Sequence, residues 1–402
     1  MKSKVDSTTK MNIRRLIDPV ERGMELRQKL IRNNKILCVD FTGTVQAEDI
    51  RKRNDSIQDV DTGAYCYRAK INVKEFDDNE RAKKNLPPFD FSDIKAIKEA
   101  MKIEFDIPLW FLRGAGDDLE NIKHYNLPMI LQLKGCNFHD GTEIGGCTFC
   151  FVDNKSNSGE EDGGVWLSQE NVVNTFEAIS DKMDIRVIRV SGGEPTLVLD
   201  FILDLYEELD KRGMAKTQIQ FDTNLSTGRL IDTFFKDGTY QWDILNKIAE
   251  FDPKVLVAFK GTDNESIQKN IQASCTITNQ IYSLQKLVSA GIDVYPYIYN
   301  PNPVTLNSFI LILQQHFRNI LPKIHIGRLN VYEVTKNRIK LMAIEQGIKY
   351  EDLLARYEKE WKRNYEISCG LMNELMMMQY GVGYKEIERP LIQIKLRQPI
   401  VE

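Results

Sequence analysis

From Leu127 to Tyr332, apolar runs typical of buried strands alternate with segments that carry apolar residues at helical spacing. The predicted strands are Pro128–Lys134, Ile185–Ser191, Gln218–Asp222, Lys254–Phe259, Asp293–Tyr299 and Lys323–Tyr332. The predicted helices are Ser168–Met183, Leu197–Arg212, Gln241–Phe251, Thr278–Ala290 and Thr305–Ile320. Strand and helix in regular alternation are the order of parallel βα units, so the pattern predicts an α/β core, which we bound at residues 126–335.

The chain on either side of this core has a weaker pattern. Residues 1–125 form a predicted N-terminal extension or cap of unknown function, in which the charged stretch from Arg51 to Asp90 indicates loops or a small β-rich cap. Residues 336–402 predict a mostly helical C-terminal segment, amphipathic through Asp352–Trp361. It then reaches a methionine stripe, Leu371–Met378, and such a stripe at helical spacing usually fills a core, although it could instead line a substrate or partner surface.

Composition and charge narrow the class of protein. A chain of 402 residues with 42% hydrophobic content suffices for one barrel-sized domain plus an appendage. No apolar run reaches the roughly 18 residues of a membrane span, so we expect no membrane partner. A net charge of −4 supplies no general attraction for nucleic acid, although a local patch within Lys10–Arg32 stays open. Seven cysteines without a signal peptide indicate a reducing, cytoplasmic setting rather than disulfides.

Three of the cysteines lie in one loop directly after the first predicted strand. Ten residues separate Cys136 from Cys147, and two separate Cys147 from Cys150. Three thiolates in one loop can hold three irons of a four-iron cluster and leave the fourth iron open to a small ligand. The last pair is also the knuckle of a structural zinc site, which needs four ligands and would recruit a distant residue or His139. From the cysteines alone, a cluster is supported about as well as a zinc site and simple packing of the thiols taken together.

A second motif follows the next predicted strand, in Ser191-Gly-Gly-Glu-Pro195. Its two glycines allow a sharp bend and close approach of a ligand, Glu194 supplies a fixed anion, and the proline stiffens the turn. Such a turn can grip an amino group. Together with the three-cysteine loop on the preceding strand, this turn resembles the radical S-adenosylmethionine superfamily.

The resemblance implies a partial (β/α)6 barrel with one [4Fe-4S] cluster on Cys136, Cys147 and Cys150, whose open iron chelates S-adenosyl-L-methionine. It assigns the contacts with the amino group to Gly192, Gly193 and Glu194, with Ser191 as a neighbouring cofactor-binding residue. Phe149 matches the aromatic position near the adenine. The long first spacing resembles 7-carboxy-7-deazaguanine synthases. Within it His139 and Asp140 could touch the active site, although we expect them to be solvated.

Two further strand ends match family positions. Asp222 and Asn224 correspond to an acidic residue and a Thr-Asn-Gly turn whose polar groups meet the cofactor, but Leu225 replaces the glycine. Lys260 lies in a segment that looks like the Lys-Gly segment of glycyl-radical activating enzymes, whose lysine pairs with the cofactor carboxylate. Ala258 stands where those enzymes have aspartate. An exposed lysine without a ligand is the alternative for Lys260.

The family chemistry would be reductive cleavage of S-adenosylmethionine to methionine and a 5′-deoxyadenosyl radical, which abstracts hydrogen from a substrate, either a small metabolite or a protein. Only Cys369 lies beyond the barrel, so we expect one cluster and an external low-potential reductant such as ferredoxin or flavodoxin. No cobalamin motif of the Asp-x-His-x-x-Gly type is present.

Two alternatives from other classes remain open. The first is a zinc-stabilised, non-catalytic binding protein on the same barrel. The second is a phosphatase, because Ile36–Val45 resembles the aspartyl-phosphate loop of haloacid-dehalogenase phosphatases with Asp40 as nucleophile. The downstream lysine and paired aspartates of those enzymes are missing, so a strand followed by a turn fits this segment better.

Overall fold

The structure is a computed structural model that describes residues 16–41, 78–90, 93–100, 128–142, 144–183, 186–271, 273–386 and 392–398. At the centre of the described chain is a six-stranded sheet in the order β10-β8-β7-β6-β5-β3, in which every neighbouring pair is parallel. The strands are β3 (Met129–Gln132), β5 (Val187–Ser191), β6 (Gln218–Thr223), β7 (Lys254–Phe259), β8 (Asp293–Tyr299) and β10 (His325–Gly327). Spatial order follows chain order, which confirms the α/β class and is consistent with a partial barrel.

Apolar sequence sets these strands. β7 is buried along all but its first residue, as expected where helices cover a parallel sheet, and its bounds and those of β8 coincide with the prediction. β10 is shorter than the predicted run Lys323–Tyr332. The sheet and the helices around it share one large apolar core.

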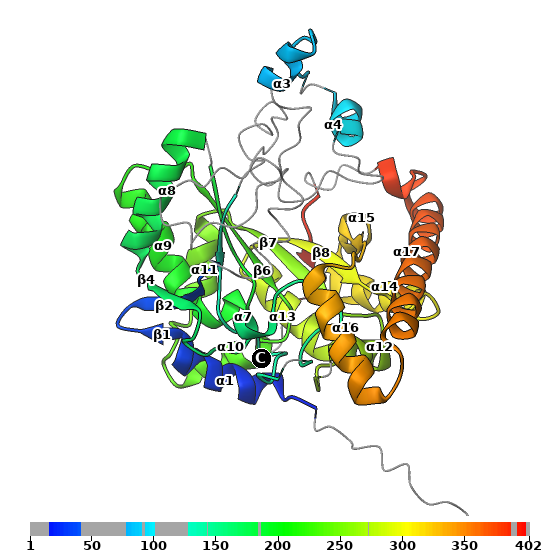
Figure 1. Ribbon diagram of the computed structural model, residues 1–402. Helices are drawn as coiled ribbons and strands as arrows, with labels where there is room; N and C mark the ends of the chain where they lie inside the picture. Colours follow the sequence, from blue (N-terminus) through cyan, green and yellow to red (C-terminus); the bar gives the residue numbers. More distant parts are fainter. Residues whose placement is uncertain are drawn as a thin grey trace, which may run out of the picture.

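The helices that follow the strands lie outside the sheet (Figure 1). They are α8 (Gln169–Met183), α9 (Leu199–Lys211), α10 (Gly228–Lys236), α11 (Ile244–Glu250), α12 (Asn264–Ile271), α13 (Ile277–Ser289), α14 (Leu306–His316) and α15 (Ile320–Lys323). The short helices α10 and α12 were not predicted. The predicted helix Thr305–Ile320 is wrong at its end, because Phe317–Arg318 forms β9 and pairs with β11 (Lys395–Leu396), a partner remote in sequence.

Part of the predicted N-terminal extension packs against the barrel. Helix α1 (Pro19–Leu30) begins at Asp18, whose carboxylate caps the first turn. Strands β1 (Ile31–Arg32) and β2 (Lys35–Val39) join β4 (Gly164–Leu167) in a three-stranded antiparallel sheet. A bridge between Cys38 and Leu133 ties this sheet to the end of β3. Asp40 therefore follows a strand, as predicted for this segment in preference to a phosphatase loop. That strand pairs in antiparallel fashion with β4.

Less of the extension is described further along. The short helices α3 (Asp78–Lys83) and α4 (Ile94–Ala100) are seen, as is a turn of helix, α7 (Asn154–Asn157), within the core. The predicted domain boundary at residues 125 and 126, most of the stretch from Arg51 to Asp90, and Cys66 lie outside the described residues. Among the described helices, none combines the length and low charge that crossing a bilayer requires.

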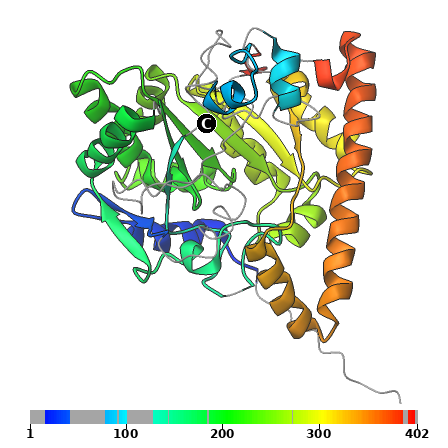
Figure 2. The same ribbon diagram turned by 45° about the horizontal axis from the view of Figure 1, so that its top comes forward.

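The C-terminal segment is helical, as predicted. Helices α16 (Glu333–Gln346) and α17 (Tyr350–Tyr380) follow the barrel. α17 contacts β10 and lies at one edge of the molecule in both views (Figures 1 and 2). The methionine stripe divides between two roles. Met372 and Met376 are fully buried in the core, whereas Met377 and Met378 are 51% and 80% exposed.

A second apolar cluster joins the cysteine loop to these C-terminal helices. Phe138, Cys147 and Phe149 from the loop pack with residues of α12, α16 and α17, among them Ile339 and Trp361. The predicted metal ligands are therefore enclosed by parts of the chain that lie far from them in sequence. This packing positions the site described next.

Candidate cofactor site

Four strand ends converge at one edge of the sheet. The cysteine loop follows β3, the Gly-Gly-Glu-Pro turn follows β5, Asn224 follows β6 and Lys260 follows β7. These strands are parallel neighbours, so their carboxyl ends share the edge at which parallel α/β folds bind ligands. The structure thus brings the sequence-predicted site residues to a common face.

The glycine turn touches the cysteine loop through backbone. Gly192 has φ +92°, and a Cβ added there would lie 1.9 Å from Gln132 Cγ. A Cβ on Gly193 would lie 2.0 Å from the carbonyl oxygen of Gly135, the residue before Cys136. The amide of Glu194 donates to that same oxygen at 2.9 Å. Only glycine fits at the two positions, and the turn is held against the start of the cysteine loop.

Glu194 is fully buried and braces two strand ends from inside. Its Oε1 accepts hydrogen bonds from the amide (3.2 Å) and the hydroxyl (2.6 Å) of Thr196, and its Oε2 accepts from the amide of Asn224 (2.8 Å). Burial raises the pKa of this carboxyl above its ordinary value, although the hydrogen bonds from Thr196 and Asn224 oppose the rise. The carboxylate is therefore committed to the protein, and its contact with a cofactor amino group stays a prediction.

Asn224 links the end of β6 to the cysteine loop. Its Nδ2 donates to Asn137 Oδ1 at 2.9 Å and lies 3.8 Å from the sulfur of Cys136. Leu225, which replaces the family glycine, adopts the left-handed conformation with φ +60°. For a residue with a Cβ, this conformation carries a backbone cost of about 1–2 kcal/mol.

The three predicted metal ligands are electrostatic neighbours. Burial, followed by the charge of Cys147, raises the pKa of the Cys136 thiol well above its usual range. Burial also raises the pKa of Cys147 to about 11, while Lys260 and Arg338 lower it and Cys150 raises it. In the described part of the chain, no three His, Cys, Asp or Glu side chains surround a single metal-ion position. The loop therefore brings the thiols near one another without arranging them as ligands.

His139 is buried, so the expectation that it is solvated is wrong. Its Nδ1 accepts a hydrogen bond from the amide of Gly141 at 3.0 Å, which leaves the proton on Nε2 for a bond to Asn154 Oδ1 at 3.3 Å. Burial lowers the pKa of His139 to about 4. Both ring nitrogens are engaged, which argues against His139 as a fourth zinc ligand. Asp140 is exposed, as expected, and caps a turn through Thr142.

An aromatic wall with a cation lies beside the loop. Phe149 stacks on Tyr299 with ring centroids 5.9 Å apart and meets the Trp361 ring edge-on at 6.2 Å. Lys260 Nζ lies 5.9 Å from the Phe149 centroid and 5.1 Å from that of Tyr299. Lys260 is half-buried and acts on the pKa of Cys147, so it is not a solvated strand-end lysine.

Asp222 forms an ion pair that no motif indicated. Its Oδ2 accepts from Arg189 Nε at 3.0 Å, from Arg189 Nη2 at 2.6 Å and from the hydroxyl of Ser191 at 2.8 Å. Arg189 and Ser191 are alternate residues of β5 and so share a face of the sheet. The arginine inside the apolar run Val187-Ile-Arg-Val-Ser191 was the available signal for this pair.

Two further residues of the site come from the C-terminal helices. Trp361 of α17 is 3% exposed, and its indole nitrogen is buried without a hydrogen-bond partner. Arg338 of α16 is 1% exposed and donates to the carbonyl oxygen of Cys150 at 2.7 Å. Neither lies in a recognisable motif. Hydrophobic periodicity reports local structure and does not predict contacts between segments so far apart in sequence.

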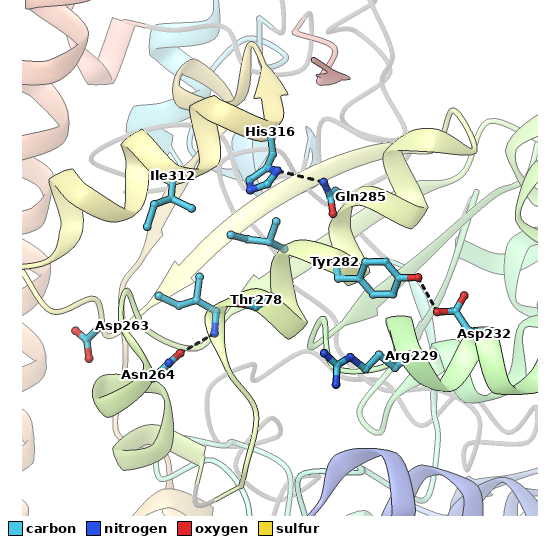
Figure 3. A pocket seen from close by; sticks show the side chains of 11 residues that line it. Arg229, Asp232, Asp263, Asn264, Thr278, Tyr282, Gln285, Ile312 and His316 are labelled. Carbon is cyan, nitrogen blue, oxygen red and sulfur yellow. Dashed lines mark hydrogen bonds between the residues drawn. The ribbon is translucent and has the colours of Figure 1, made fainter. Parts of the chain in front are cut away.

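A separate cavity of about 730 Å³ lies among helices α10, α12, α13 and α14 (Figure 3). None of the predicted cofactor-binding residues lines it. Its polar side chains partly pair with one another, as Tyr282 donates to Asp232 Oδ2 at 2.6 Å and Gln285 lies 3.2 Å from His316 Nδ1. We therefore assign it no ligand.

Comparison with known families shows which family the region around the cysteine loop matches. Residues 132–314 match the model of the Radical SAM superfamily. These residues form a radical SAM domain. It extends from the last residue of β3 into α14, and so includes the three cysteines, the Gly-Gly-Glu-Pro turn, Asn224 and Lys260. A domain of this family implies an enzyme that uses S-adenosylmethionine and a four-iron cluster.

Solved structures of one radical SAM enzyme are also similar. The cobalamin-dependent S-adenosylmethionine radical enzyme OxsB with aqua-cobalamin bound matches with a TM-score of 0.33 and 16% identity over 62% of this chain and 32% of that chain. OxsB with aqua-cobalamin and S-adenosylmethionine bound matches with a TM-score of 0.34 and 17% identity, over 57% and 31%. This chain spans about a third of the length of those structures. No curated protein matches.

Proposed function

We propose that this chain uses a single [4Fe-4S] cluster on Cys136, Cys147 and Cys150 to cleave S-adenosylmethionine reductively and to abstract hydrogen from a substrate. The observation that carries the proposal is the backbone contact between two remote motifs. The Gly193 turn approaches Gly135 so closely that no side chain fits, and the Glu194 amide bonds to the same carbonyl oxygen. A ligand of the cluster would therefore meet this turn directly.

The donor set supports a cluster over a closed zinc site. The loop offers three thiols, which are soft ligands suited to iron–sulfur clusters, and three are the number that leaves one iron open. The nearby histidine, His139, uses both ring nitrogens in hydrogen bonds. Because burial raises the pKa of Cys136 and Cys147, metal binding would release protons from these thiols, and their charge would be held by the metal.

When bound, the cluster supplies the electron that breaks the sulfonium, and the cofactor supplies the 5′-deoxyadenosyl radical. The protein side chains bind and orient. Lys260 offers an ammonium for the cofactor carboxylate, and the face of Phe149 offers an apolar surface for the adenine. Asp222, held by Arg189 and Ser191, offers an oxygen to the ribose or methionine part.

Packing around the loop would keep water from the reacting groups. Phe138 is fully buried, Cys147 is 9% exposed and Trp361 is 3% exposed, so the loop is closed from the α17 side. A radical in contact with water or oxygen is lost to side reactions, and an apolar enclosure limits this loss.

For the substrate and the electron donor, we propose only a chemical class. The substrate is a small metabolite or a protein, and the donor is an external low-potential reductant of the ferredoxin or flavodoxin kind. The cobalamin of OxsB is not carried over, because this sequence has no Asp-x-His-x-x-Gly motif.

The test is cofactor cleavage without substrate. Reconstituted protein reduced with dithionite should release methionine and 5′-deoxyadenosine in equal amounts, measured by chromatography and mass spectrometry. Cys147→Ala should release neither, whereas Cys369→Ala, which removes a partly buried thiol of α17 outside the cluster that contains Cys147, should behave as wild type. Binding of S-adenosylmethionine without cleavage over hours, with several low-potential reductants, would remove the catalytic proposal. Methylthioadenosine as product would show that another carbon–sulfur bond breaks.

A further inference from the structure

Arg338 is a buried cation that the proposed chemistry does not use. It lies in α16, beyond the residues matched to the radical SAM domain, and is 1% exposed. Its guanidinium donates to the carbonyl oxygens of Cys150 (Nη1, 2.7 Å) and Val152 (Nη2, 3.1 Å) and to Asn154 Oδ1 (Nη2, 2.8 Å). Arg338 thus binds three oxygens in the five residues that begin at the last cysteine.

Among the described residues, Arg338 has no carboxylate partner. The hydrogen bonds of its guanidinium all go to neutral oxygens. Its Nε is also buried without a hydrogen-bond acceptor. An uncompensated buried cation is costly, and neutral carbonyl groups offset only part of that cost. The charge therefore calls for an anion close to Cys150.

The anion that the chain can form at this position is the set of cysteine thiolates. The Nη1 atom of Arg338 donates to the backbone carbonyl of Cys150 at 2.7 Å, which places its charge beside the last of the three cysteines. Packing orients this part of α16 toward the loop, because the adjacent Ile339 is fully buried in the cluster that contains Cys147 and Phe149. α16 therefore presents the cation to the loop in the folded protein before any metal binds.

We propose that Arg338 is a positioning residue that clamps the Cys150 end of the loop and fixes one positive charge beside the iron–sulfur cluster, where it favours the reduced form. This inference rests on the proposed function. Reduction adds one electron, taken from the external donor, to a cluster that the thiolates already make anionic. A fixed cation stabilises the more negative form more strongly, so it raises the reduction potential.

The experiment is a redox titration of reconstituted protein without S-adenosylmethionine or substrate. Dithionite supplies the electrons through mediators, and the paramagnetic signal of the reduced cluster reports its fraction. Arg338→Gln should lower the ratio of reduced to oxidised cluster roughly tenfold at a given potential, which is about 59 mV for one electron. Arg338→Lys keeps the charge and should stay within a few-fold of wild type. Lys340→Gln, an exposed charge on the same helix, should change nothing.

A second readout separates the clamp from the charge. Both Arg338 variants lose the forked contact with Cys150, Val152 and Asn154, so both should release iron to a chelator faster than wild type. Equal potentials in wild type and Arg338→Gln would leave only a structural role and overturn the charge assignment. If Arg338→Gln does not fold, Arg338→Lys decides, because a tenfold fall in its ratio contradicts the charge assignment. Wild-type protein that takes up no iron would refute the proposed function as well, whereas four irons with unchanged potentials would refute only this inference.

Discussion

A substitution of Glu194 tests whether this carboxylate stabilises the fold or binds the cofactor. Its two carboxylate oxygens accept three hydrogen bonds, from the amide and hydroxyl of Thr196 and from the amide of Asn224. Glu194→Gln keeps the shape but replaces one acceptor oxygen with an NH2 donor. If the amide oxygen stays on Thr196, the new donor faces the N–H of Asn224, and both are left buried and unpaired.

The size of the effect follows from these contacts. Loss of a hydrogen bond to a charged group costs about 1.5–3 kcal/mol, and an unpaired buried donor costs about 1–3 kcal/mol. Removal of the buried charge also removes its desolvation cost, which offsets part of this loss. We therefore expect the free energy of unfolding of the metal-free protein to fall by roughly 2–4 kcal/mol. Glu207→Gln, on the exposed face of α9, should change it by less than about 0.5 kcal/mol.

The assay is urea unfolding of the metal-free variants, followed by circular dichroism and tryptophan fluorescence. A lower midpoint with an unchanged slope reports a change in stability alone. An unchanged midpoint in Glu194→Gln, together with a tenfold or greater loss of S-adenosylmethionine affinity in the reconstituted protein, would refute the reasoning. That result would mean that the carboxylate faces the cofactor rather than Thr196 and Asn224.

Three further substitutions test the remaining strand ends. Gly193→Ala should lower the free energy of unfolding by about 2–3 kcal/mol or more and weaken iron retention, because its Cβ would lie 2.0 Å from the Gly135 oxygen; wild-type denaturation and iron content would contradict this. Asp222→Asn should cost about 2–4 kcal/mol in thermal or urea unfolding, because it leaves Arg189 without its anion, and a second change, Arg189→Leu, should recover part of the loss. Lys260→Met should weaken S-adenosylmethionine binding roughly tenfold in calorimetry at unchanged iron content, and unchanged affinity would remove Lys260 from the site.

The strand ends were predictable because their signals are local. An apolar run fixes β7 and β8, and a short motif directly after a strand marks the cysteine loop and the glycine turn. In a parallel sheet the carboxyl ends of neighbouring strands meet at one edge, so strand order alone brings these motifs together. The left-handed conformation of Leu225 was the exception, because residues with a Cβ rarely adopt it and nothing local in the sequence indicates it.

The supporting residues were not predictable, because tertiary contacts decide them. His139 lies in a polar insertion that suggests exposure, yet Asn154 and Gly141 hold its ring inside. Arg338 and Trp361 reach the loop from helices nearly two hundred residues downstream. Periodicity identifies the buried face of such a helix but not what that face covers.

Anaerobic iron and sulfide analysis tests the central claim most directly. After reconstitution, the wild-type chain should hold about four irons and four sulfides, the content of one cluster. Each of Cys136→Ala, Cys147→Ala and Cys150→Ala should lose the brown chromophore, while Cys369→Ala keeps it. One zinc per chain in place of iron, or full iron incorporation in all three loop variants, would contradict the account.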